Sequence, residues 1–241
     1  RQMCIRDRYD VYVESFTENW EKLERYDNNA PKTMNAHLHV LEAYTLLYQC
    51  WKDNGLKKRL EFCVDLFMNR IYDPSRRHFN LFFDNEWNSL VEMDSYGHDV
   101  ETGWLLCEAA RTLENQDLIK RTNLLALDVT GACLAEGMSD KGYMIYEKKG
   151  DRKTKHASWW GQVETMIACV NAWQISGDEA WLQSADTVWT FVKDHMVDKE
   201  YGEWYSDCFD GEPKKGAPKV SMWRCPYHTV RLGVEMYNRL K

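Results

Sequence analysis

The feature that most constrains this fold is a helical pattern that repeats about every sixty residues along the chain. Turn-forming pairs mark the repeat at Asn54-Gly55, Asn115-Gln116 and Gly177-Asp178. Within each repeat, a helix that is apolar nearly all round precedes an amphipathic one, as expected for an inner helix followed by an outer helix. The period suits a helical hairpin with a loop and is too long for tetratricopeptide or ankyrin units. The sequence therefore predicts an all-α fold, an (α/α) toroid of inner helices surrounded by outer ones.

Apolar residues spaced as on a helix predict seven helices, with short extended segments in the loops between them. The helices are expected at 33–51, 56–71, 97–113, 117–136, 160–175, 179–197 and 226–240. Asn54-Gly55 is expected to end the first of them. Segments 79–83 and 89–93 flank Asp84-Asn85-Glu86, which predicts a short β-hairpin.

The whole chain, residues 1–241, is expected to be a single domain. Four units of about sixty residues use its full length, whereas closed toroids of this kind have about six hairpins. We therefore expect the C-terminal part of an (α/α)6 barrel, with about four hairpins present and the N-terminal hairpins missing. Residues 1–8 fit poorly with the sequence that follows and resemble translated adaptor sequence, so we expect them to be artefactual.

Charge, hydropathy and cysteine usage exclude several classes of function. The formal net charge is −7 and no block of basic residues interrupts the acidic excess, which argues against a nucleic-acid partner. No apolar stretch reaches about 18 residues, so we expect no membrane span. None of the eight cysteines forms a C-x-x-C pair, and most lie in apolar helical runs as small buried side chains. Unpaired buried thiols indicate a reducing compartment, and we expect a cytoplasmic protein.

Eleven tryptophans and thirteen tyrosines are many for 241 residues. They either fill a large aromatic core or form a carbohydrate cleft, because the flat C–H faces of sugar rings stack on aromatic rings. Composition alone favours the core. Close to candidate histidines at a helix start, a sugar platform is the better interpretation, and we apply it to Trp160 and Trp223.

Candidate functional groups gather at the predicted starts of the inner helices. They are Asn35 and His39; His98 and Glu101; Trp160, Gln162 and Glu164; and His228. The inner helices of a toroid all run in the same direction, so these groups are expected to meet at one rim. The positive ends of the helix dipoles point at that rim and favour a negatively charged intermediate.

The histidines allow structural as well as functional interpretations. His37 and His39 are two positions apart on a helix and cannot bind one metal together, so one of them is expected to be structural. We expect no metal site, because no set of His, Cys and carboxylate residues has ligand spacing. His98 and Glu101 share a helix face, either as an ordinary pair or as an imidazole oriented by a carboxylate. The sequence contains no nucleophile triad, phosphate loop or nucleotide fingerprint.

Four sequence blocks carry a resemblance to a known family. The blocks are residues 32–39 (KTMNAHLH), 95–101 (SYGHDVE), 159–164 (WWGQVE) and 223–228 (WRCPYH). In this order they are similar to signatures of the cellobiose 2-epimerases, and less closely to those of the wider N-acylglucosamine 2-epimerase superfamily. The resemblance spans nearly the whole chain and implies an (α/α)6 barrel. Family members extend further at the N-terminus, which implies that an arginine and a tyrosine of the pocket are missing here.

The resemblance also implies an isomerase and its mechanism. The family inverts C2 of the reducing-end sugar in β-1,4-linked disaccharides, converting cellobiose to glucosyl-mannose and lactose to epilactose, with no cofactor. After ring opening, a base removes the C2 proton to give a cis-enediol, and an acid returns a proton to the opposite face. By resemblance His98 and His228 are this pair, and His39 assists ring opening. The residues implied to bind or shape the sugar are Asn35, Glu101, Trp160 and Trp223.

Three alternative functions stay open at this point. An N-acylglucosamine 2-epimerase would use the same fold and paired histidines on an N-acetylated monosaccharide. A glycoside hydrolase on an (α/α)6 barrel would need two carboxylates beside the bond, and Glu101 and Glu164 are the candidates. The chain could also be a non-catalytic sugar-binding module. In each case the partner is a small sugar, with no nucleic acid and no membrane, and the oligomeric state is open.

Overall fold

The computed structural model describes residues 12, 18–19, 30–221 and 223–241. Residues 1–8, which we expect to be artefactual, lie outside the described residues. The chain divides into two compact units. Unit 1 comprises residues 1–94 and 108–116, and unit 2 comprises residues 95–107 and 117–241. Among the helices of the described ranges, none combines the length and the apolar character needed to cross a bilayer.

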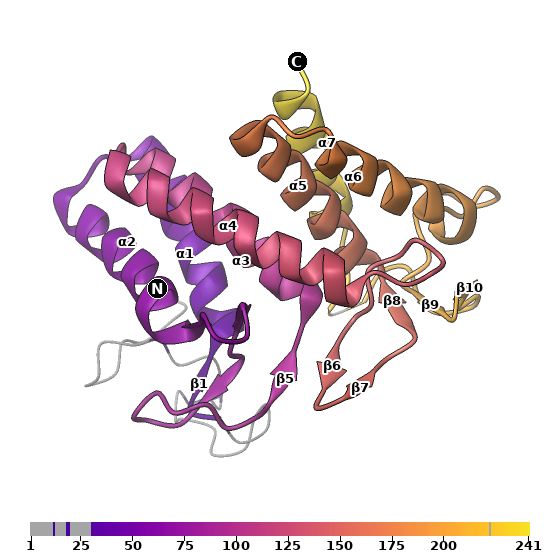
Figure 1. The fold of residues 1–241 in the computed structure, drawn as a ribbon, viewed down its shortest axis with the longest axis horizontal. Helices are drawn as coiled ribbons and strands as arrows, with labels where there is room; N and C mark the ends of the chain where they lie inside the picture. The colour runs from indigo at the N-terminus through magenta and orange to yellow at the C-terminus, as the bar shows by residue number, and fades with distance from the viewer. Residues whose placement is uncertain (1–11, 13–17, 20–29, 222) are drawn as a thin grey trace. The chain divides into compact units, whose positions relative to one another are not determined.

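The predicted all-α character is confirmed, because seven α-helices dominate the part of the chain that the structure describes (Figure 1). Their bounds are α1 (Met34–Cys50), α2 (Asn54–Leu66), α3 (Tyr96–Thr112), α4 (Gln116–Gly137), α5 (Trp159–Ser176), α6 (Ala180–Phe191) and α7 (Tyr227–Arg239). Short π-helical segments end the second and sixth helices: η2 (Phe67–Ile71) and η3 (Val192–Met196). The predicted ranges therefore hold, but the last turn of these two helices is wider than periodicity indicates.

In unit 1, α1 packs against α2, and short strands join the loops around them. The strands are β1 (Lys32–Thr33), β2 (Tyr72–Asp73), β3 (His78–Phe79), β4 (Phe82–Phe83) and β5 (Met93–Asp94). β1 pairs with β4, and β2 with β3, both antiparallel. The short hairpin expected around Asp84 is present: its arms form an antiparallel bridge at Phe83–Ser89, and the N–H of Leu90 donates to the carbonyl of Phe82 (2.9 Å). β4 pairs in addition with β1, which the sequence does not predict.

The break between α1 and α2 lies earlier than the sequence predicts. The side chain of Asp53 accepts a hydrogen bond from the backbone N–H of Leu56 (2.9 Å), which caps the start of α2. Asn54-Gly55 is therefore the first turn of α2 and not the end of α1. At the start of α1, Thr33 caps in the same way by accepting from the N–H of Ala36 (3.2 Å).

In unit 2, α5 packs against both α6 and α7, and its residues 161–172 are all buried (Figure 1). This burial explains why α5 is apolar nearly all round and confirms it as an inner helix. Ser158 caps its start, and Gly177 ends it in the left-handed conformation (φ 75°). The strands of unit 2 are β6 (Lys148–Lys149), β7 (Arg152–Lys153), β8 (His156–Ser158), β9 (Asp207–Phe209) and β10 (Glu212–Pro213). β9 lies between β8 and β10.

Within the described residues, no second helix forms a hairpin with the final helix, α7. An apolar groove of about 550 Å³ lies beside α7. The groove is lined from α5, α6 and α7, with Trp189 and Trp204 in its wall and Leu240 at its end. On α7 itself, Val230, Val234 and Tyr237 are 59%, 51% and 69% exposed. α7 therefore presents apolar side chains that no described element covers fully.

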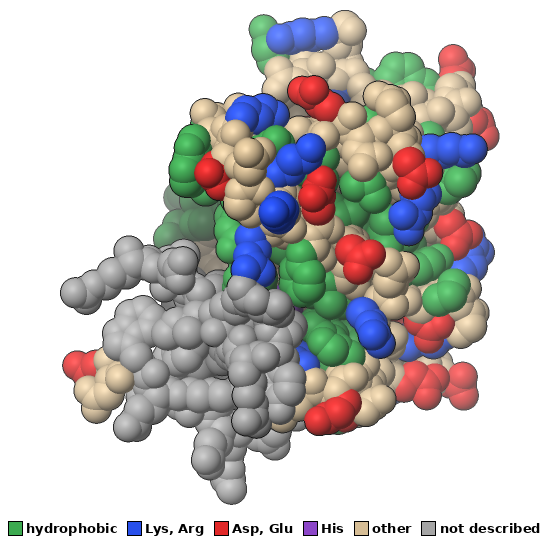
Figure 2. Space-filling view, turned by 90° about the vertical axis from the view of Figure 1, so that its left-hand side faces the viewer, with side chains coloured by type: hydrophobic (Ala, Val, Ile, Leu, Met, Phe, Trp, Pro, Cys, Tyr) green, Lys and Arg blue, Asp and Glu red, His purple; other side chains and the backbone are tan. Residues whose placement is uncertain are grey.

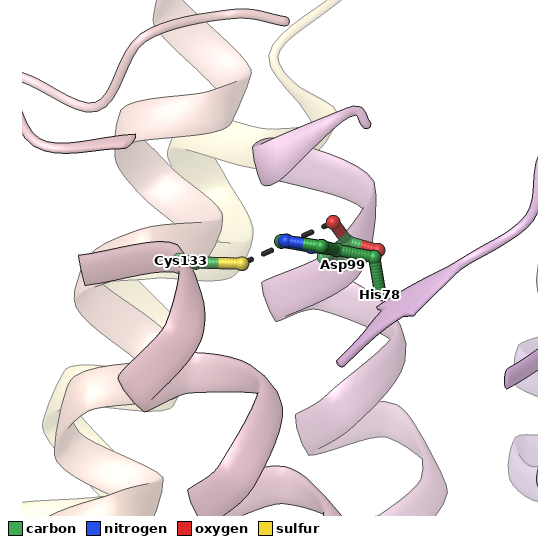
Figure 3. Close-up of side chains that lie close together, drawn as sticks. All are labelled: His78, Asp99 and Cys133. Atoms are coloured by element: carbon green, nitrogen blue, oxygen red, sulfur yellow. Dashed lines mark hydrogen bonds between the residues drawn. The ribbon is translucent and has the colours of Figure 1, made fainter. Parts of the chain in front are cut away.

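The cysteines behave as predicted in the described part of the chain: none is in a disulfide and five of seven are buried. Burial raises the pKa of the Cys63 and Cys169 thiols to about 12. Cys133 of α4 lies beside Asp99 of α3, with Sγ 3.9 Å from Oδ2 and both side chains buried (Figure 3). Charges of both signs are interspersed on the face that Figure 2 shows.

Candidate active site

The starts of three helices of unit 2, α3, α5 and α7, bring the candidate groups together. His98 comes from the first turn of α3, Trp160 from the first turn of α5, and His228 from the first turn of α7. The Trp160 ring contacts both imidazoles, with its centroid 4.6 Å from that of His98 and 5.8 Å from that of His228. Two titratable rings thus contact one indole.

A buried carboxylate orients His228. Nδ1 of His228 lies 2.7 Å from Oε1 of Glu164, whose side chain has no exposed surface. Because an ionised carboxylate only accepts hydrogen bonds, Nδ1 is the protonated nitrogen in this arrangement. Trp104 donates its indole N–H to the second oxygen of Glu164 (2.9 Å). Glu164 is therefore held at both oxygens and fixes the orientation of the His228 ring.

Arg231 supplies the positive charge that these buried carboxylates need. Its Nη1 donates to Oε1 of Glu101 (2.7 Å) and to Oε1 of Glu164 (3.0 Å). The arginine side chain is 8% exposed, and its guanidinium lies over the ring of Tyr227 at 4.2 Å. Ionised carboxylates are stable in a buried site only when they are paired and hydrogen-bonded, and Arg231 provides this for both.

His98 is held from its own helix start and by a close approach between helices. Its Nδ1 lies 2.8 Å from Oγ of Ser95. Next to it, a Cβ added to Gly97 would lie 2.6 Å from Cζ3 of Trp160 and 3.2 Å from Cα of Gly161. Only glycine therefore lets the indole of Trp160 lie against the start of α3. The Gly97-His98 pair in the sequence reflects this packing.

The segment before α7 is anchored to the start of α5. Arg224 is 4% exposed and lies over the ring of Trp159 at 5.1 Å. It also donates to the backbone carbonyl of Trp204, and its burial lowers the pKa of the guanidinium. Since Trp159 in turn approaches His228 edge-on at 6.3 Å, this anchor fixes where α7 begins.

Comparison with known proteins now decides the family. Residues 2–231 match the sequence profile of the N-acylglucosamine 2-epimerase (GlcNAc 2-epimerase) family. The chain belongs to the N-acylglucosamine 2-epimerase family. The signature blocks from which the sequence predicts this membership fall within the matched range, including the one that carries His228.

Two individual relatives show how similar the chain is to particular proteins of the family. A cellobiose 2-epimerase of Bacteroides fragilis is 40% identical over 235 residues, which are 93% of this chain and 59% of that protein. A cellobiose 2-epimerase of Dictyoglomus turgidum is 34% identical over 235 residues, covering 95% of this chain and 60% of that protein. The chain thus spans about three fifths of the length of the relatives it matches.

Solved structures confirm the (α/α)6 fold class. The cellobiose 2-epimerase of Bacillus thermoamylovorans superimposes with a TM-score of 0.91 at 34% identity, over 97% of this chain and 61% of that one. A D-mannose isomerase gives a TM-score of 0.79 at 17% identity, over 98% of this chain and 62% of that one, a likeness of fold alone.

Three other predicted site residues are Asn35, His39 and Trp223. His39 and Asn35 belong to α1 in unit 1, where the His39 side chain is 46% exposed and lies 3.4 Å from Glu42. Trp223, in the segment before α7, is 73% exposed. Its role as a sugar platform stays a prediction, as do the roles of Asn35 and His39.

Of the pair at the start of α1, His37 is the structural histidine. It has no exposed surface, its Nδ1 lies 2.7 Å from the carbonyl oxygen of Thr33, and the N–H of Tyr12 points at its Nε2 (3.4 Å). Both ring nitrogens are therefore occupied by backbone groups. Gln162 is also structural, since its side chain clasps the backbone of Met144 from both sides (2.8 and 2.9 Å).

Arg231 is the residue that sequence reasoning misses. The available signal is its spacing, because Arg231 follows His228 by three positions and so shares a face of α7 with it. Glu101, Glu164 and His228 each offer a ligand atom within 4.8 Å of the others, the arrangement a metal ion would use. Arg231 contacts both carboxylates, so an ion at this point would have to displace its guanidinium.

Proposed function

We propose that the chain carries the proton-transfer groups of a carbohydrate 2-epimerase that acts on the reducing-end sugar of β-1,4-linked disaccharides. Cellobiose would become glucosyl-mannose and lactose would become epilactose. The observation that supports this most is the contact of both His98 and His228 with Trp160, with His228 oriented by the buried Glu164. The relatives that are named cellobiose 2-epimerases support the choice of substrate class.

In the proposed reaction the two histidines exchange a proton at C2. After the sugar ring opens to the aldehyde, one imidazole removes the C2 proton, and that electron pair forms the C1–C2 double bond while O1 takes up a proton from the group that assists ring opening. The resulting cis-enediol gains a proton at C2 from the second imidazole, on the opposite face, while O1 returns its proton to the group that supplied it and C1 becomes an aldehyde again. No electrons are gained or lost overall. Histidine suits both steps because its proton affinity lies near neutral pH.

The remaining predicted residues have supporting roles in this proposal. His39 would assist ring opening, and Asn35 and Glu101 would bind sugar hydroxyls. Trp160 and Trp223 would shape the sugar site by stacking. Glu101 is fixed by Arg231 (2.7 Å), so its carboxylate is preset for a hydroxyl that donates to it.

A second epimerase function is favoured by the name of the family profile itself. An N-acylglucosamine 2-epimerase would use the same pair of histidines on an N-acetylated monosaccharide. The hydrolase alternative is weaker, because hydrolysis needs two carboxylates beside the bond. Glu101 and Glu164, the two candidates, are both paired with the guanidinium of Arg231.

Product analysis tests the proposal. The chain would be assayed as it is and as a chimera, in which it is joined to the part of the Bacteroides fragilis relative that it does not match. Each protein is incubated with cellobiose, lactose or N-acetylmannosamine. We expect the chimera to form an intact disaccharide epimer from cellobiose and lactose, and the chain alone to form little. Conversion of N-acetylmannosamine alone would support the second epimerase function, and free glucose would support a hydrolase. Sugar binding without any product from either protein would leave a binding module.

We also propose that the protein works in a reducing compartment, the cytosol. Support comes from the described cysteines, which are all unpaired, and from the deep burial of Cys63 and Cys169. Thiol titration of the unfolded, unreduced protein from its native host should find all eight thiols free. Fewer free thiols would contradict this assignment.

A further inference from the structure

A row of four aromatic rings within unit 2 leads from the surface to Trp160. Phe209 is 51% exposed and stacks on His156, with centroids 4.8 Å apart and planes within 10°. His156 contacts Tyr146 at 4.7 Å, and Tyr146 meets Trp160 edge-on at 5.9 Å and 86°. His156 thus contacts two aromatic rings, and the row ends at Trp160, which contacts His98 and His228.

A hydrogen-bonded contact with a carboxylate fixes the rotation of the His156 ring. Its Nε2 lies 2.6 Å from Oδ1 of Asp207, and the two side chains are 20% and 23% exposed. The pair joins β8 to β9, and Asp207 is the register partner of Ser158, which caps α5. Burial opposes ionisation of Asp207, but hydrogen bonds from His156 and Ser206 outweigh it and hold the pKa of this carboxyl below its usual range.

The backbone beside the row is fixed as well, so the rings have little freedom to move independently. The N–H of Tyr146 donates to the carbonyl of His156 (2.8 Å). Two residues earlier, the side chain of Gln162 clasps both backbone groups of Met144. Tyr146 is therefore tied to β8 through its backbone and to α5 through its neighbour, and its ring contacts His156 and Trp160.

We propose that the His156–Asp207 pair positions side chains of the candidate active site. It holds Tyr146 against Trp160 and so sets the orientation of the Trp160 ring relative to His98 and His228. His156 and Asp207 act through other side chains and are positioning residues. The catalytic consequence of this inference rests on the proposed function. Misplacing reacting groups by about 1 Å can lower a rate by about a hundredfold, so even a small tilt of Trp160 matters.

The chain offers a matched control in His195, which stacks on Phe191 with nearly the same geometry (4.8 Å and 18°) but belongs to η3. His156→Leu removes the ring and its contact with Asp207, and His156→Phe restores a ring between Phe209 and Tyr146. His195→Leu removes an equivalent ring stack elsewhere in unit 2. Thermal unfolding of each variant shows whether it is folded.

The first readout is the proton–carbon correlation spectrum of the histidine rings in the 241-residue chain, with the His98 and His228 signals assigned through single substitutions to Gln. Both rings lie close to the Trp160 ring, so their Cε1–H signals report its tilt. We expect His156→Leu to move both signals, His156→Phe to return them only part of the way because it restores the ring without the contact to Asp207, and His195→Leu to leave them in place. Unmoved signals in folded His156→Leu would overturn the proposal.

Two further measurements keep the inference testable. If His156→Leu does not fold, Tyr146→Leu breaks the row while leaving the contact between His156 and Asp207, and the same two signals should move; unmoved signals would again overturn the proposal. In the chimera, we expect His156→Leu to lower kcat about tenfold or more with KM nearly unchanged, as expected for lost alignment. Shifted signals in a protein that makes no epimer would uphold the positioning role and contradict the proposed function, so the two failures are distinguishable.

Discussion

The start of α1 and the start of α7 both carry histidines, yet their surroundings differ. At α1, His37 is fully buried and both of its nitrogens meet backbone groups, while the His39 side chain is 46% exposed. At α7, His228 meets the carboxylate of Glu164, which is itself buried and paired with Arg231. A ring whose nitrogens are both held by backbone is fixed in place. A ring held at one nitrogen by a carboxylate keeps the other nitrogen for proton transfer.

The largest expected effect separates these two histidines directly. In the chimera, His228→Ala should lower epimerisation by about 10²- to 10⁴-fold, because a positioned acid–base group is lost. Sugar binding, measured by calorimetry, should be largely retained. His37→Ala should act on stability instead and lower the free energy of unfolding by about 1–3 kcal/mol, since it leaves buried backbone groups without a partner. Near-parental turnover by His228→Ala would show that the assigned role is wrong.

The second effect tests the buried charges that distinguish the α7 site. Arg231→Met leaves Glu101 and Glu164 without their shared cation and should lower the free energy of unfolding by about 3–5 kcal/mol. Arg121→Met is the matched control: Arg121 lies 3.7 Å from Asp117 at an exposed position, so its loss should change stability by about 0–1 kcal/mol. Urea unfolding measures both. Equal losses for the two variants would contradict the account of the carboxylate pair.

The third effect concerns the packing of Trp160 against the start of α3. Gly97→Ala places a methyl group 2.6 Å from the indole and should lower the free energy of unfolding by about 1–3 kcal/mol, with loss of activity in the chimera. Gly233 on α7 is the control, because nothing lies within 4 Å of a Cβ built there. Gly233→Ala should raise stability by roughly 0.5–1 kcal/mol through helix propensity. A Gly97→Ala protein as active and stable as the parent would show that Trp160 is not tightly seated.

The helices could be predicted from the sequence because apolar spacing over ten or more residues separates them clearly. The π-helical ends at Phe67–Ile71 and Val192–Met196 could not, since five residues are too few to show a change of period. The pairing of β4 with β1 joins segments about fifty residues apart, which no local pattern in the sequence indicates.

The same limit applies to the site. His98, Trp160 and His228 were accessible from helix starts and signature blocks. Arg231 was not, because an arginine one turn into an amphipathic helix is ordinarily a solvated side chain. Its role follows only from its contacts with the buried Glu101 and Glu164, which depend on the tertiary structure.

The smallest expected effect concerns the apolar side chains on α7. Large exposed apolar patches promote association, so we expect the 241-residue chain to self-associate weakly and to show little activity by itself. Replacing Val230 and Val234, which are 59% and 51% exposed, with Glu should return it to the monomer. Light scattering across a concentration series measures this. A parent chain that stays monomeric throughout with full activity would show that α7 needs no further cover.

The most direct test of the central claim is epimerisation in heavy water. If two histidines on opposite sides of C2 remove and return the proton, the new proton comes from an exchangeable site on the protein. Cellobiose incubated with the active protein in D₂O should therefore give glucosyl-mannose that carries deuterium at C2 of the reducing-end sugar, as read by NMR. Epimer formed with its original C2 hydrogen fully retained would contradict proton exchange through His98 and His228.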